Sequence, residues 1–104
     1  MDNKIAELVN QEVKDSTNKY GEFNSSHEGY AVLLEEIEEL SDEHSSMLYW
    51  KQRLWECIKT NDAKNIEEAI KNLKILSSRL LHEGVQAAAM VVKFDQLMRR
   101  GLNE

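Results

Sequence analysis

The sequence predicts an all-α protein, a compact bundle of four or five helices. Proline is absent and only four glycines interrupt the 104 residues, and the most frequent residues are mostly good helix formers. Apolar residues also recur every three or four positions along most of the chain, which is the period of an amphipathic helix. A chain of this length fits one domain, so we expect residues 1–104 to form a single helical domain.

The first helix is expected over residues 3–19, where the apolar side chains fall on one face. These side chains are Ile5, Leu8, Val9 and Val13. The segment "YGEFNSS" then interrupts the pattern with a glycine and a cluster of small polar residues. This composition is typical of a loop.

The second helix is expected to begin after Ser25. Ser25 is a suitable N-cap, and Glu28 three positions later completes the S-x-x-E pattern of a capping box. The helical period continues to about His44, and the polar segment "SDEHSS" is expected to kink the chain before a third helical stretch, "MLYWKQRLWECIK". The polar segment "KTNDAKN" then predicts a loop.

The last helix is expected from about Ala63 to Arg100, with a bend near Gly84. Its apolar positions keep the helical spacing nearly without a break. They are Ile66, Ile70, Leu73, Leu76, Leu80, Ala87, Val91, Phe94 and Met98.

The segment of residues 27–43 is unusually acidic. It carries seven carboxylates, and no lysine or arginine occurs between Lys19 and Lys51. A surface helix usually alternates Glu with Lys, because opposite charges four residues apart stabilise it and like charges destabilise it. A turn of 100° per residue brings the carboxylates of this helix into one acidic stripe, made of Glu35, Glu36, Glu39 and Glu43.

The acidic stripe has two interpretations, a solvated face or a cation site. Tyr30, Leu33, Leu34, Ile37 and Leu40 fill the opposite side of the same helix. Glu36 is the member of the stripe nearest to that apolar side. A carboxylate at such a boundary is well placed to line a cleft.

Glu83 lies in the middle of the apolar face of the last helix, and Gln86 lies at the edge of that face. A buried carboxylate without a partner would cost several kcal/mol or take up a proton. Three partners would compensate it: a basic side chain such as Arg53 or Arg79, a proton, or a metal ion. Gln86 is either a hydrogen-bonding residue between helices or a neutral ligand beside that ion.

Mg²⁺ prefers oxygen ligands and usually keeps several waters, which phosphate oxygens can replace. Two carboxylates on one helix that face a third on another helix provide such a site. The run "EEIEE" at residues 35–39 matches the EExxE signature of the MazG-like all-α nucleoside triphosphate pyrophosphohydrolases. Together with "HEGYAVLLEEIEEL" and "EGVQAAAMVVKF", the chain resembles the small phage and prophage branch of that superfamily over about residues 20–98.

The resemblance implies an Mg²⁺-dependent or Mn²⁺-dependent hydrolase that splits a nucleoside triphosphate into a monophosphate and pyrophosphate. It places the metal ligands on Glu36, Glu39, Glu83 and Gln86, with Glu35 as the catalytic base. Gln86 stands where the family has an aspartate, which removes one formal charge from the site. The alternatives are a non-catalytic phage module that keeps the fold for binding or assembly, and a plain structural bundle with a buried ion pair.

Several side chains outside these motifs have simpler interpretations. Glu28 is expected to cap its helix and His27 to lie beside the cap, although either could contact a phosphate. Lys51 and Arg53 are expected to pair with the acidic stripe or to contact a triphosphate. Tyr49, Trp50 and Trp55 are expected in the core or in an interface rather than stacked on a nucleobase.

The composition also limits the partners. The net charge of −6 argues against nucleic acid, because phosphate backbones require a basic surface. The sequence has no signal peptide and no long apolar run, so we expect a cytoplasmic protein that does not bind a membrane. Long apolar helix faces exceed what a core of this size covers, which predicts a homo-oligomer, a dimer or a tetramer. The expected ligand is a nucleoside triphosphate or another small phosphorylated molecule.

Overall fold

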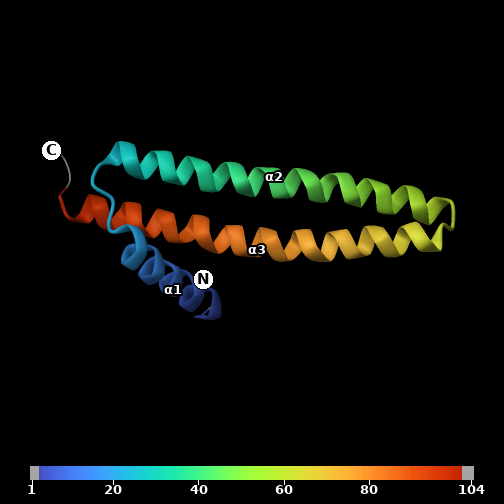
Figure 1. The fold of residues 1–104 in the computed structure, drawn as a ribbon, viewed down its shortest axis with the longest axis horizontal. Helices are drawn as coiled ribbons and strands as arrows, with labels where there is room; N and C mark the ends of the chain where they lie inside the picture. The colour runs from blue at the N-terminus through green and yellow to red at the C-terminus, as the bar shows by residue number, and fades with distance from the viewer. Residues whose placement is uncertain (1–2, 102–104) are drawn as a thin grey trace.

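The computed structural model describes residues 3–101, which form three helices (Figure 1). Helix α1 spans Asn3–Tyr20, α2 spans Ser26–Lys59 and α3 spans Ala63–Arg99. The predicted all-α class is confirmed. The prediction of four or five helices is wrong, because the two middle helical stretches form one helix of 34 residues.

The polar segment at residues 41–46 does not interrupt α2. Serine and aspartate favour helix ends only where they cap free backbone groups. Neither proline nor glycine occurs in this segment, so nothing prevents the helix from continuing. Gly84 likewise lies within the continuous helix α3.

The connection between α1 and α2 follows the predicted boundaries closely. Gly21 has φ +81° and its N–H donates to the Thr17 carbonyl at 2.8 Å, as is usual for glycine at a helix C-terminus. The Ser25 hydroxyl accepts from the Glu28 N–H at 3.1 Å, which confirms the N-cap. The Glu28 carboxylate accepts from the Asn24 N–H at 3.3 Å, so it caps one residue earlier than a regular capping box requires.

A three-residue turn joins the two long helices. Asn61 adopts φ +53°, a conformation that asparagine tolerates better than most residues. The Asp62 carboxylate caps α3 by accepting from the Asn65 N–H at 3.3 Å. Because the turn is short, α2 and α3 run antiparallel along their whole length (Figure 1).

Helix α3 lies between α2 and α1, and α1 covers only the C-terminal half of α3 (Figure 1). The hydrophobic core sits where all three helices meet. Its buried members are Val9, Val13, Phe23, Ala89, Met90 and Leu97. Gly29 allows α2 to approach this core closely, because a Cβ atom there would lie 2.8 Å from the Phe94 ring.

The other half of the hairpin has no third helix. The molecule is therefore elongated, with extents of 61 × 27 × 23 Å and a radius of gyration of 18.1 Å. A compact domain of this length would have a radius of gyration of about 13 Å. The expected compact shape is thus wrong for a single copy of the chain. No helix within residues 3–101 has an apolar stretch long enough to cross a membrane.

Candidate metal centre

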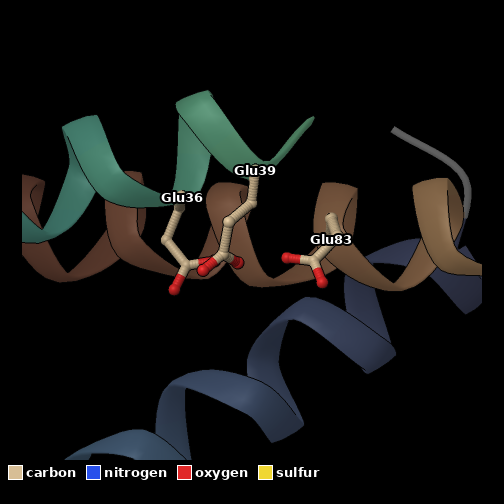
Figure 2. A group of neighbouring side chains, drawn as sticks. All are labelled: Glu36, Glu39 and Glu83. Carbon is tan, nitrogen blue, oxygen red and sulfur yellow. The ribbon is translucent and has the colours of Figure 1, made fainter. Parts of the chain in front are cut away.

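Three carboxylates from the two long helices meet beside α1. Glu36 and Glu39 lie one turn apart on α2, and Glu83 on α3 points toward them (Figure 2). Each residue offers one oxygen, and these oxygens all lie within 4.8 Å of one another. The structure therefore brings together three of the four predicted metal ligands.

The amphipathic pattern of the helices explains this meeting. Glu36 is half-buried on the side of α2 that faces α3, a side that it shares with Leu33 and Leu40. Glu83 is half-buried on the apolar face of α3, one turn before the buried Ala87. Glu39 is exposed at the edge of the contact. The stripe is therefore not a fully solvated face, since Glu36 is directed toward the partner helix.

Two of the carboxylate oxygens are buried without a hydrogen-bond partner. They are Oε2 of Glu36 and Oε2 of Glu83. Neither Arg53 nor Arg79 forms an ion pair with Glu83 within residues 3–101. A buried salt bridge therefore does not compensate Glu83 in the described part of the chain, and a proton and a metal ion remain as the compensating groups.

The pKa values of two carboxyl groups respond to this crowding. Burial raises the pKa of Glu36, and the negative charges of Glu39 and Glu35 raise it further, while His82 lowers it. A hydrogen bond with the Glu83 carboxyl group raises the pKa of Glu39, and desolvation and the charge of Glu83 add to this effect. A cation between these carboxylates would relieve the repulsion among their negative charges.

A cavity of about 530 Å³ lies next to the carboxylates, between α1 and the hairpin. Glu35, Glu36 and Gln86 all line this cavity. The predicted base and the predicted fourth ligand therefore line the same cavity as Glu36, one of the three carboxylates. The other lining residues are Glu12, Ser16, Tyr20, Gly21, Phe23, Asn24, Glu28, Val32, Met90 and Lys93.

Lys93 is a cavity residue that the sequence interpretation missed. Its side chain is 3% exposed, and its ammonium group donates to the Ser16 hydroxyl and to the Gly21 carbonyl, both at 2.9 Å. Burial lowers its pKa, while Glu28 and Glu22 act in the opposite direction. Its position seven residues after Gln86 puts it on the same side of α3. This spacing is the sequence feature that could have identified Lys93 as a neighbour of Gln86 in the cavity.

Other predicted contacts fall outside the cavity. Glu43 is half-buried on α2 but is not part of the three-carboxylate group. His27 is exposed, and neither Lys51 nor Arg53 lines the cavity. Trp50 is half-buried, whereas Tyr49 and Trp55 are 59% and 53% exposed, so these two are not core residues of the single chain.

The donor set fits a hard divalent cation. Three carboxylate oxygens leave room for waters or phosphate oxygens in an octahedral shell, which suits Mg²⁺ and Mn²⁺. The buried oxygens without partners are the groups that a cation would satisfy. Comparisons with protein-family models, with curated proteins and with solved structures found no match.

Proposed function

We propose that this chain is a MazG-like nucleotide pyrophosphohydrolase, a cytoplasmic phage or prophage protein of a bacterial host. It hydrolyses a nucleoside triphosphate to a monophosphate and pyrophosphate with Mg²⁺ or Mn²⁺ as cofactor. The observation that supports this proposal best is the meeting of Glu36, Glu39 and Glu83, two of which have buried oxygens without partners. A protein that needed these side chains only for stability would gain by replacing them with apolar residues.

In this proposal Glu36, Glu39 and Glu83 hold the cation, which supplies charge neutralisation for the phosphate oxygens. Glu35 lies exposed on the cavity wall and accepts a proton from the attacking water. The water oxygen bonds to the α-phosphorus, the bond to the bridging oxygen breaks, and pyrophosphate leaves with that oxygen. A cavity of about 530 Å³ lies within the usual range for a small-molecule site.

Gln86 reduces the charge of this site. Its side chain can coordinate only through a neutral oxygen. The site would therefore bind a metal ion at this position more weakly than it would with an aspartate. We therefore expect low rates, or a preference for Mn²⁺, which binds such ligands at least as readily as Mg²⁺.

The test is pyrophosphate release from a panel of canonical and modified nucleoside triphosphates. We expect slow metal-dependent turnover by the wild type and none by Glu36→Gln or Glu39→Gln. Glu38→Gln is the matched control, because Glu38 lies on the same helix but is exposed and outside the three-carboxylate group. Equal rates in Glu38→Gln and Glu39→Gln would contradict the assigned roles.

The neutral Gln86 also favours a second candidate, a non-catalytic module that binds a phosphorylated ligand or supports assembly. The variant Gln86→Asp separates the two. Activity in the wild type supports the enzyme, and activity only in Gln86→Asp means that the missing charge has silenced the site. If both proteins bind Mn²⁺ and release no pyrophosphate across the panel, the non-catalytic module is the better account.

A further inference from the structure

The ammonium group of Lys93 lies on the wall of the cavity of about 530 Å³. Its two acceptors, the Ser16 hydroxyl and the Gly21 carbonyl, belong to residues that also line this cavity. An ammonium group has three N–H donors, so one donor has no acceptor within residues 3–101. No carboxylate of the described residues forms an ion pair with Lys93 either. A lysine that is 3% exposed therefore holds a charge without a counterion and an unused donor beside the cavity.

Glu28 provides an acceptor near this donor. Its carboxylate also lines the cavity, and its charge raises the pKa of Lys93 against the effect of burial, yet the two groups form no ion pair. The two oxygens of Glu28 accept from the backbone N–H and the side-chain amide of Asn24 at 3.3 and 3.4 Å, and each keeps a second lone pair. A ligand with an acceptor next to a donor would satisfy both Lys93 and Glu28.

The cavity wall around Lys93 is aromatic and apolar. Phe23 is 4% exposed, and the centroid of its ring lies 4.9 Å from Lys93 Nζ. Tyr20 also lines the cavity, and it is 74% exposed. An exposed aromatic ring can stack on a flat aromatic ligand. The remaining apolar side chains of the wall are Val32 and Met90.

This end of the cavity lies away from the three carboxylates. Lys93 follows Gln86 by seven residues and Glu83 by ten, which corresponds to about 10 and 15 Å along α3. A ligand that occupies both ends must be elongated, with different chemistry at its two ends. A nucleotide has this form, because its phosphates are anionic and its base is a flat ring. Each base also presents acceptors and donors side by side on its Watson–Crick edge.

We propose that the Lys93 end of the cavity is a nucleobase subsite, in which Lys93 donates to the base, Glu28 accepts from it and Tyr20 stacks on its ring. This inference rests on the proposed function, because it assigns the other end of the same substrate. A phosphate is the alternative ligand for an ammonium group, but the carboxylate of Glu28 would repel it. A neutral base avoids this repulsion and leaves the phosphates at the end of the cavity near Glu36.

Titration calorimetry with uridine, cytidine, adenosine and guanosine in metal-free buffer tests the subsite alone, because nucleosides have no phosphate. We expect the wild type to bind at least one of them saturably. Tyr20→Ala should weaken this binding about fivefold or more, since it removes the stacked ring. Tyr30→Ala is the matched control, because Tyr30 is also exposed, at 62%, but lies outside the cavity. It should leave the affinity unchanged.

Lys93→Met tests the hydrogen bond to the base. Methionine keeps a long unbranched side chain but has no donor, so the affinity for the same nucleoside should fall at least about tenfold. The affinity for inorganic tripolyphosphate in the presence of Mn²⁺ should stay the same, because tripolyphosphate has no base. Circular dichroism checks that the variant is folded. If Lys93→Met does not fold, the comparison of the two tyrosine variants decides.

A wild type that binds none of the four nucleosides would overturn the proposal, and so would equal affinities in Tyr20→Ala and Tyr30→Ala. Equal losses of nucleoside and tripolyphosphate binding in folded Lys93→Met would assign Lys93 to a phosphate and would also overturn it. Nucleoside binding is measured without metal and without turnover. The subsite can therefore be present where pyrophosphate release fails, and turnover can occur where the two tyrosine variants show no difference.

Discussion

The two sides of the α2–α3 hairpin differ in where they place charge. On one side, Glu36, Glu39 and Glu83 converge beside a cavity. On the other side, α2 exposes large hydrophobic side chains, among them Tyr30, Leu34 and Ile37. One pair of helices thus presents a polar concave side, suited to a small charged ligand, and an apolar side, suited to protein contact.

On this hairpin, burial in the single chain does not follow the polarity of the side chains. Glu36 is half-buried, whereas Tyr30 and Leu34 on the same helix are more than 40% exposed. An arrangement that places a carboxylate inside and apolar residues outside is unfavourable for a lone monomer. It is understandable if a cation occupies one side and a protein surface the other.

The largest effect is expected where α1 closes the cavity side. Leu97 is fully buried in the core that holds α1 against α3. Leu97→Ala should lower the free energy of unfolding by about 2–5 kcal/mol, because it removes buried surface and leaves a cavity. Urea denaturation measures the change. Leu8→Ala is the control, since Leu8 is 57% exposed on α1, and its effect should stay below about 1 kcal/mol.

A smaller effect, of opposite sign, is expected from Glu36→Gln in metal-free buffer. The pKa of Glu36 is raised above its ordinary value of 4.5 in the folded protein, so its ionised form destabilises the fold. Below pH 4.5 the carboxyl group is neutral in both states and the substitution should have little effect. As the pH rises through the raised pKa, the wild type should lose stability relative to Glu36→Gln.

Thermal unfolding at several pH values measures this difference, and Glu38→Gln is again the control. Added Mn²⁺ should reverse the order at neutral pH, because an ion that binds only the folded state stabilises the wild type by mass action. A stability difference that is independent of pH and of Mn²⁺ would contradict the role of Glu36 as a metal ligand.

The sequence was sufficient to predict the all-α class, the N-cap at Ser25 and the helix faces on which Glu36 and Glu83 lie. These features depend on local spacing, because residues three or four positions apart share one face of a helix. The meeting of the three carboxylates across two helices was implied by the family resemblance and not by spacing. The number of helices was predicted wrongly because the segment at residues 41–46 has a capping composition without a residue that breaks the helix.

The cavity residues outside α2 and α3 were less accessible to sequence analysis. Lys93 and Ser16 are separated by 77 positions and meet only because α1 folds back on α3. Local periodicity contains no information on such a contact. The exposure of Tyr30, Leu34 and Ile37 was also not apparent, since an apolar row predicts burial without identifying the partner that covers it.

The central claim is that the three-carboxylate group binds a divalent cation, and titration calorimetry with Mn²⁺ tests it most directly. We expect saturable binding by the wild type and by Glu38→Gln. In Glu83→Gln, which keeps the size of the side chain, binding should be weaker by at least about tenfold, since even outer-shell partners of a metal change affinity by that much. Folded wild type that shows no saturable Mn²⁺ binding, or folded Glu83→Gln that binds as tightly as the wild type, would contradict the account.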